Sequence, residues 1–191
     1  MVKHILEGKF YLFLSFLLSF EEIEKLKNLL KIEIITPKEN EKYAAVGVIL
    51  KNDSVLLVKR IEDPRDPWSG QVSFPGGHFE KNDKNTLNTA IREVKEEVGI
   101  DLKKCADLIG SLSIQRPHNM PDLNVIPYLF KIKTQDFFVT GSEEISYPFW
   151  ASLNVLIEQK DNEEFYYQGN IIWGLTSRIL KELIYLLSKD L

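Results

Sequence analysis

The chain of 191 residues is long enough for one domain with a substantial hydrophobic core. Hydrophobic residues make up 44% of it and charged residues 27%, the ordinary balance of a water-soluble globular protein. The formal net charge of −4 argues against broad binding to nucleic acid, because such binding needs a basic surface. The single cysteine, Cys105, cannot form an internal disulfide, so we expect a protein of the reducing cytoplasm.

An apolar run at residues 10–20 follows two lysines, as the core of a signal peptide would. The run is shorter than the roughly 20 apolar residues that a membrane-spanning helix needs. Two glutamates follow it in place of a cleavage site. We therefore expect a buried or partner-facing helix and no membrane partner, with secretion as the alternative.

Ser19 and Glu22 have the spacing of a capping box, in which each side chain binds the backbone of the other residue. This predicts a second helix that runs through Leu30. Its apolar residues recur at helical spacing and form one inner face: Ile23, Leu26, Leu29 and Leu30. We assign residues 1–36 to a helical N-terminal extension, which either packs on the following domain or forms the interface of a homodimer.

Residues 37–191 are assigned to one domain, which opens with a β-hairpin. Residues 43–50 are almost continuously apolar and predict a buried strand. Residues 55–60 predict its partner after a short turn, which completes the hairpin. The prolines and the glycine of residues 61–72 then predict a loop.

Side chains suited to ligand binding lie in and beside this loop. Arg60 and Arg65 offer guanidinium groups that can bind phosphate, and Trp68 offers an aromatic face for stacking. The indole of Trp68 fits the core of the domain equally well. Residues 74–77, Phe-Pro-Gly-Gly, predict a tight turn whose glycines let the backbone approach a ligand closely.

The helix that follows carries acids on one face. It begins at a cap formed by Asp83 or Asn85 and ends at Gly99, which suits a C-cap. The acids lie within one turn of each other: Glu93, Glu96 and Glu97. Solvated acidic faces are common. After a glycine-containing segment, however, carboxylates also suit a divalent cation such as Mg²⁺ that shares its ligands with phosphates.

Residues 74–100 resemble the Nudix box. The family's pattern is a glycine, five residues, a glutamate, seven residues, and then Arg-Glu-apolar-any-Glu-Glu-any-Gly-apolar. Residues 92–100 match every fixed position of the second half. In the first half, the sixth residue after Gly77 is Asp83 instead of glutamate, and eight residues separate it from Arg92. This expansion is similar to the coenzyme A pyrophosphatase branch of the family.

That branch also carries a signature before its box: two leucines, an arginine, a small residue, a second arginine and a glycine. The corresponding residues here are Leu56, Leu57, Arg60, Arg65 and Gly70. This chain departs from the signature in two places. Ile61 replaces the small residue, and four residues instead of three separate Arg65 from Gly70. The resemblance covers roughly residues 43–187.

Beyond the acidic helix, residues 107–114 and 123–133 predict two strands. The second contains Pro127, so we expect it at a sheet edge or at a bulge. Residues 149–153 predict the start of a helix. The tail predicts a hairpin and a terminal helix whose apolar residues share one side: Ile179, Leu180, Leu183, Leu186 and Leu187.

The resemblance implies an α/β/α sandwich, an α+β fold in which the acidic helix packs on a mixed β-sheet. It also implies an enzyme that hydrolyses the diphosphate bond of a small nucleoside diphosphate derivative, with coenzyme A as the first candidate. A nucleoside triphosphate or ADP-ribose is the alternative substrate, because the spacing around Arg65 departs from the branch. A non-catalytic nucleotide-binding module is the alternative outside enzymes.

The resemblance implies a metal site on the acidic helix. Mg²⁺ or Mn²⁺ would be held by Glu93, Glu96 and Glu97, and the Gly76 carbonyl would add an oxygen ligand. The ion would neutralise charge on the diphosphate and activate a water. Arg92 would orient a glutamate through a charge-assisted hydrogen bond.

The remaining implied roles fall on loops. Arg60, Arg65 and Gly77 would contact the substrate. Glu144, with Glu143 as the second choice, would act as the general base on a late loop. Both acids fit solvated loop positions equally well.

Overall fold

The structure is a computed structural model that describes residues 19–65, 68–134 and 139–188. The greater part of the apolar run expected at residues 10–20 therefore lies outside the described residues. No helix within the described ranges has both the length and the apolar character needed to cross a membrane.

The described residues form a seven-stranded sheet in which β1 and β6 run parallel and the other neighbours run antiparallel. The strand order is β3-β2-β1-β6-β5, while β4 pairs with β1 and β7 pairs with β2. The strands are β1 (Lys42–Lys51), β2 (Ser54–Arg60), β3 (Val72–Ser73), β4 (Gly76–His78), β5 (Ala106–Ser111), β6 (Leu123–Ile132) and β7 (Ile145–Ser152).

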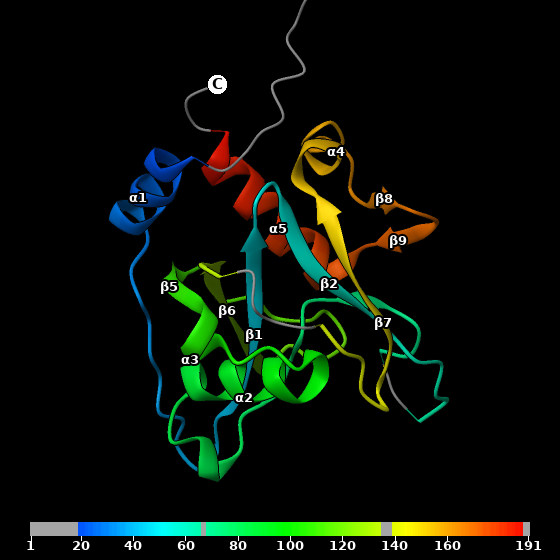
Figure 1. Ribbon diagram of the computed structural model, residues 1–191. Helices are drawn as coiled ribbons and strands as arrows, with labels where there is room; N and C mark the ends of the chain where they lie inside the picture. Colours follow the sequence, from blue (N-terminus) through cyan, green and yellow to red (C-terminus); the bar gives the residue numbers. More distant parts are fainter. Residues whose placement is uncertain (1–18, 66–67, 135–138, 189–191) are drawn as a thin grey trace, which may run out of the picture.

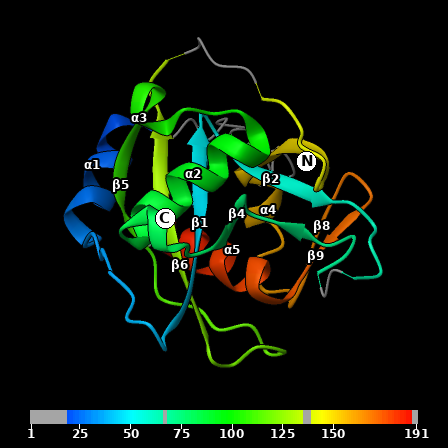
Figure 2. The same ribbon diagram turned by 90° about the horizontal axis from the view of Figure 1, so that it is seen from below.

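Helices lie on both faces of this sheet (Figures 1 and 2), which confirms the α/β/α arrangement. Helix α2 (Thr86–Val98) covers one face and α5 (Gly174–Leu187) covers the other. The shorter elements are α1 (Phe20–Leu29), the 3₁₀ turn η1 (Lys81–Asp83), α3 (Leu102–Cys105), α4 (Leu153–Ile157), β8 (Phe165–Tyr167) and β9 (Asn170–Ile172). Strands β8 and β9 form the predicted hairpin before the terminal helix.

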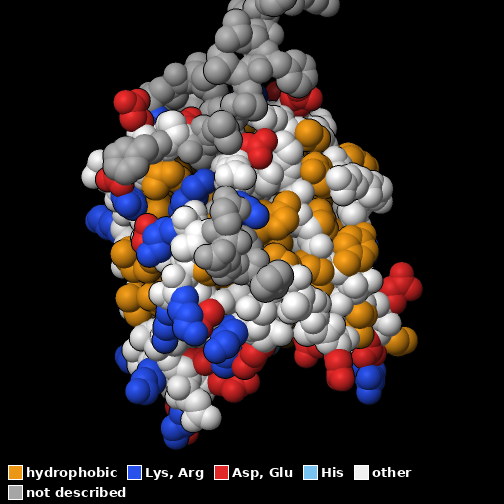
Figure 3. All heavy atoms as spheres, in the orientation of Figure 1, with side chains coloured by type: hydrophobic (Ala, Val, Ile, Leu, Met, Phe, Trp, Pro, Cys, Tyr) orange, Lys and Arg blue, Asp and Glu red, His pale blue; other side chains and the backbone are white. Residues whose placement is uncertain are grey.

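The alternation of side chains along β1 builds a separate core under each helix. Ala45 and Ile49 are fully buried on the α2 side, and Val48 and Leu50 are fully buried on the α5 side. On the face shown in Figure 3, exposed hydrophobic side chains lie over β7 and the β8–β9 hairpin. The two cores fix α2 and α5 against the sheet, and α2 carries the acids of interest.

The N-terminal helix α1 has the predicted capping box. Ser19 Oγ accepts the backbone N–H of Glu22 at 3.2 Å, and the backbone N–H of Ser19 donates to the Glu22 carboxylate at 2.6 Å. Ile23 and Leu26 are buried in the α5-side core, so the helix packs on the domain. The inner face predicted for it is wrong at Leu29, which is 50% exposed because it points away from this core.

Two predictions after the acidic helix are wrong. Residues 149–153 do not start a helix: they continue β7 through Ser152, and the helix begins only at Leu153. Antiparallel pairing with β2, in which Phe149 lies opposite Leu57, decides the conformation of this aromatic-rich run. Strand β6 is also not at an edge, because it lies between β1 and β5. Its pairing with β5 contains a register shift between Leu108 and Gly110, where the extra residue lies on β5 opposite Leu129 and Phe130 and not at Pro127.

Candidate active site

Helix α2 presents its acids beside β4. The side chain of Asn85 accepts a hydrogen bond from the backbone N–H of Asn88 at 2.9 Å, so Asn85 and not Asp83 caps the helix. Gly99 ends it in the left-handed conformation, with φ at 75°, as predicted. Apolar residues at four-residue spacing are fully buried against the sheet and fix the rotation of the helix: Ala90, Val94 and Val98.

Glu97 is the most buried acid on α2, with 6% of its surface exposed. Its Oε2 accepts the backbone N–H of Gly76 at 3.0 Å, and its Oε1 lies 3.7 Å from Nη1 of Arg60. Burial raises the pKa of Glu97 to about 7, and the charge of Glu93 adds to the rise. The hydrogen bond from Gly76 and the charge of Arg60 offset this only in part.

Glu93 lies against β4, and the two glycines of that strand make the approach possible. A Cβ atom on Gly77 would overlap the Glu93 carboxylate, and one on Gly76 would overlap the backbone of β1 at Ala45. The two glycines therefore let β4 pack closely between β1 and the Glu93 side chain. The tight turn predicted for residues 74–77 is wrong, because Gly76 and Gly77 belong to this strand. Burial also raises the pKa of Glu93, against the lowering effect of Arg92.

Arg92 holds the acids through all sides of its guanidinium. Nε and Nη2 donate to the two carboxylate oxygens of Asp83 at 2.8 and 3.0 Å. Nη1 donates to Glu93 at 2.8 Å and to Glu96 at 3.0 Å. Nη2 also donates to the carbonyl of His78 at 3.1 Å. With each guanidinium nitrogen engaged, Arg92 has the geometry of the orienting residue that the resemblance implies.

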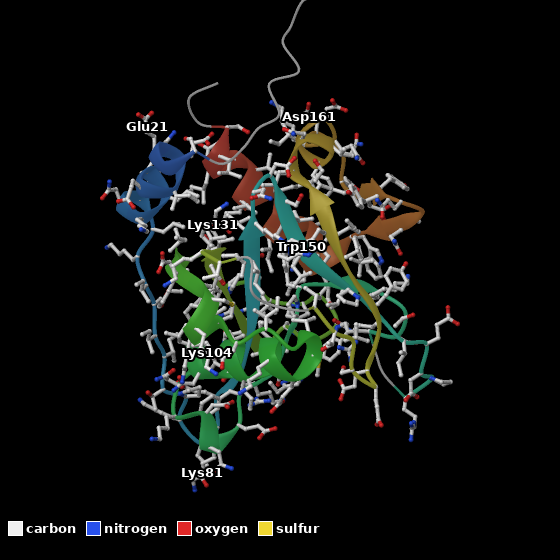
Figure 4. All side chains as sticks on the ribbon, viewed as in Figure 1. Glu21, Lys81, Lys104, Lys131, Trp150 and Asp161 are labelled. Atoms are coloured by element: carbon white, nitrogen blue, oxygen red, sulfur yellow. The ribbon has the colours of Figure 1, made fainter. Side chains whose placement is uncertain are left out.

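Asp83 is the partner that sequence reasoning did not assign to the site. It ends the η1 turn, where it is 6% exposed, whereas Lys81 of the same turn points into the solvent (Figure 4). Burial tends to raise the pKa of Asp83, but hydrogen bonds from Arg92, from the Glu80 backbone and from Thr89 outweigh it and hold the pKa below its ordinary value. Its position in the Nudix box could have indicated this role, because Asp83 occupies the position of the family's first glutamate.

A cavity of about 610 Å³ adjoins these acids. Most of the predicted site residues line it: Arg60, Gly76, Gly77, Arg92, Glu93, Glu96, Glu97 and Glu144. Glu144 Oε2 lies 3.7 Å from Nη2 of Arg60, so Arg60 stands between Glu144 and Glu97. The structure thus brings Glu144, from the loop before β7, to the same cavity as the acids of α2.

Two predicted residues do not line the cavity. The Arg65 side chain is 90% exposed, and its guanidinium binds Asp63 at 2.8 Å. Glu143, the second choice for the general base, is exposed and lies outside the lining. Trp68 does line the cavity; it is half-buried, and its ring lies 6.1 Å from that of His78.

Sequence reasoning also missed lining residues that are distant from the box. They come from β1, from β6 and the loop before it, and from the start of α5, and include His118, Asn119, Trp173 and Leu175. No local pattern marks them, because only the fold brings these segments to the glycines of β4.

The chemistry of the acids fits a hard divalent cation. Two largely buried carboxylates, Glu93 and Glu97, have raised pKa values and act on each other unfavourably, which an added cation would relieve. In the described part of the chain no three Asp, Glu, His or Cys side chains are close enough together to enclose an ion; Nη1 of Arg92 instead bridges Glu93 and Glu96. Glu93 and Glu97, beside the β4 backbone, are the carboxylates best placed to hold such a cation.

Comparison with known proteins agrees with this arrangement. The family model described as NUDIX domain matches residues 41–168. The chain belongs to the Nudix family. It is 30% identical over 152 residues to the protein named uncharacterized Nudix hydrolase NudL of Yersinia pestis (strain Pestoides F), covering 72% of this chain and 75% of that protein. The Nudix membership and these hydrolase relatives make it a pyrophosphohydrolase, which sets the non-catalytic alternative aside.

Solved structures of other Nudix proteins share the fold. A NUDIX hydrolase from Nitrosomonas europaea matches with a TM-score of 0.56 and 17% identity, covering 81% of this chain and 76% of that one. A C. elegans Ap4A hydrolase matches with a TM-score of 0.50 and 23% identity, covering 78% and 98%. Nudix hydrolases generally act with a divalent metal ion, in agreement with the acids of α2.

Proposed function

We propose that this Nudix hydrolase cleaves the diphosphate bond of a nucleoside diphosphate derivative, with coenzyme A or a related compound as the first substrate to test. The observation that carries the proposal is the pair of buried acids, Glu93 and Glu97, which face a cavity of about 610 Å³ with raised pKa values. Buried carboxylates whose charge is not fully balanced by cationic side chains are suited to bind a divalent cation. That cation can in turn bind the oxygens of a diphosphate.

The metal ligands in this proposal are Glu93, Glu96, Glu97 and the carbonyl oxygen of Gly76. When bound, Mg²⁺ or Mn²⁺ neutralises charge on the diphosphate oxygens and makes a water molecule more acidic. Binding at Glu96 requires its carboxylate to leave Arg92, which it contacts at 3.0 Å. Glu96 is also the most exposed of the three acids, with 60% of its side chain accessible, so this movement meets little resistance.

The protein's own groups position the reactants. Arg92, anchored by Asp83, keeps the Glu93 carboxylate turned toward the cavity. The Gly76 N–H holds one oxygen of Glu97, which leaves its other oxygen on the side of Arg60. Fixed carboxylates cost little reorganisation when the substrate enters, which is how a preorganised site lowers a barrier.

The substrate contacts in this proposal are Arg60 and the backbone of Gly77, both of which line the cavity. Arg65 is a third proposed contact, but its guanidinium must leave Asp63 and turn toward the cavity to reach a phosphate. The proposed general base is Glu144, whose side chain is 71% exposed. Its place beside Arg60 at the cavity allows it to accept a proton from a water held there.

The experiment that tests the function is product analysis with coenzyme A, ADP-ribose and a nucleoside triphosphate, each with Mg²⁺ and with Mn²⁺. Cleavage of coenzyme A at the P–O–P anhydride of its diphosphate supports the proposal. Faster turnover of ADP-ribose or of the triphosphate favours the second candidate, which the altered spacing between Arg65 and Gly70 motivates. Absence of metal-dependent turnover of any of them contradicts the proposal.

The cellular setting also remains a proposal. We propose a monomeric or homodimeric enzyme of the cytoplasm with no nucleic-acid partner, which fits the net charge of −4 and the free, buried Cys105. The division into an extension at residues 1–36 and a catalytic domain at residues 37–191 is likewise proposed.

A further inference from the structure

The cavity has an apolar half built on a small cluster that is separate from the two main cores. Ala44, Leu123 and Val125 form a third, separate cluster, with exposures of 6%, 3% and 4%. Val46 and Leu175 pack both against this cluster and against the α5-side core. All five of these side chains line the same cavity as the acids.

The sheet explains why this apolar wall faces the cavity. Ala44 and Val125 are partners on the neighbouring strands β1 and β6. The residues after them, Ala45 and Ile126, are buried in the α2-side core, so the alternation of strand side chains points Ala44 and Val125 to the opposite face. There α5 begins with Gly174, and Leu175 of its first turn lies at the cavity. The wall is thus built by three elements that the box does not contain.

The basic groups of the cavity face the acids of α2. Among the described residues that line the cavity, the lysines and arginines are Arg60 and Arg92, and both face acids of the α2 site. The apolar half therefore offers no lysine or arginine to neutralise a further phosphate. An ionised group placed there would lose its hydration without a compensating partner.

This half of the cavity also has few polar side chains that could form hydrogen bonds with a ligand. Thr176 already donates its hydroxyl proton to the carbonyl of Val72 at 3.0 Å. The other uncharged polar or histidine side chains of the lining are Gln71, Ser73, His78, His118 and Asn119. Trp173 at the start of α5 adds an indole that is 48% exposed. A nucleobase carries several ring and exocyclic polar atoms, each of which needs a partner when buried. A chain with few polar groups suits this wall better.

We propose that the apolar half binds an uncharged, largely aliphatic group esterified to the second phosphate of the substrate, and that Val125 and Leu175 set this specificity. The inference rests on the proposed function, since it takes the diphosphate to lie at the acids of α2. It assigns this half of the cavity to the group beyond the diphosphate, and not to the nucleoside.

The test uses a homologous series of adenosine diphosphate monoesters that carry methyl, butyl and hexyl groups on the second phosphate. We expect KM to fall by up to about fourfold for each added methylene, because each buried CH₂ contributes ~0.8 kcal/mol. Val125→Thr and Leu175→Ser should flatten this dependence on chain length. Val155→Thr, on the exposed face of α4 and outside the cavity, is the matched control and should keep the wild-type dependence.

The outcomes separate this inference from the proposed function. Turnover of all three esters with the same KM overturns the inference and leaves the diphosphatase activity standing. A chain-length dependence that Val125→Thr and Leu175→Ser leave unchanged overturns the assignment to this wall. If no ester is turned over, product analysis with coenzyme A, ADP-ribose and the triphosphate decides the proposed function. Calorimetric Kd values for the ester series then decide the inference, and values independent of chain length overturn it.

Discussion

Glu97 should make the metal-free protein less stable as the pH rises, whereas a carboxylate with a lowered pKa would make it more stable. Its pKa is raised from 4.5 to about 7 in the folded chain, chiefly by burial. Below pH 4.5 the carboxyl is protonated in both the folded and the unfolded protein, and it causes no penalty. Between the two values only the unfolded chain ionises it, so the free energy of unfolding falls as the pH rises. Above pH 7 the loss is complete.

The size of this loss follows from the two pKa values. A carboxyl with a pKa of about 7 when folded and 4.5 when unfolded loses roughly 3 kcal/mol of stability. Glu97→Gln removes the ionisation but keeps an oxygen that can accept the Gly76 N–H. In EDTA we therefore expect the free energy of unfolding of the variant to exceed that of the wild type by up to about 3 kcal/mol at pH 8. The difference should largely vanish at pH 4.5.

The assay is urea unfolding of the full chain in EDTA at a series of pH values. Glu143→Gln is the matched control, because Glu143 is exposed and lies outside the cavity. Adding Mn²⁺ should raise the stability of the wild type at pH 8 more than that of Glu97→Gln, since a cation relieves the charge of Glu97. A difference between wild type and Glu97→Gln that stays constant from pH 4.5 to pH 8 would refute the reasoning.

Three further predictions concern the groups around the acids. Asp83→Asn should lower kcat by about 10- to 100-fold, as expected for loss of a group that orients a ligand, while KM changes less; an unchanged kcat contradicts the role given to Asp83. Gly77→Ala should lower kcat by about 100-fold with the circular dichroism spectrum preserved, because the new Cβ displaces Glu93; normal turnover would exclude that contact. Arg60→Ala should raise KM more than it lowers kcat, and by at least about tenfold more than Arg65→Ala does, because only Arg60 lines the cavity; equal effects would show that Arg65 turns inward.

The acidic helix could be predicted from sequence because its signals are local. Ala90, Val94 and Val98 recur at helical spacing, Asn85 can cap the first turn, and Gly99 can end the last. The α/β/α arrangement followed from the resemblance of this segment to the Nudix box. The relative positions of the acids on α2 therefore follow from the same short segment that carries the resemblance to the Nudix box.

Other features depend on contacts between distant segments, which no local pattern encodes. The aromatic-rich run that begins at Phe149 is a strand because β2 lies beside it. Arg65 has the residue type of a phosphate ligand, but Asp63, two positions away, binds its guanidinium. Val125 and Leu175 reach the cavity only after the sheet and α5 have assembled.

The central claim is that Glu93 and Glu97 hold a divalent cation at the cavity. The most direct measurement is the anomalous difference density of crystals of the full chain grown with Mn²⁺. The account predicts a peak bonded to both carboxylates beside the backbone of β4. Ordered Glu93 and Glu97 side chains that keep their contacts with Arg92 and the Gly76 N–H, with no anomalous peak between them, would contradict it.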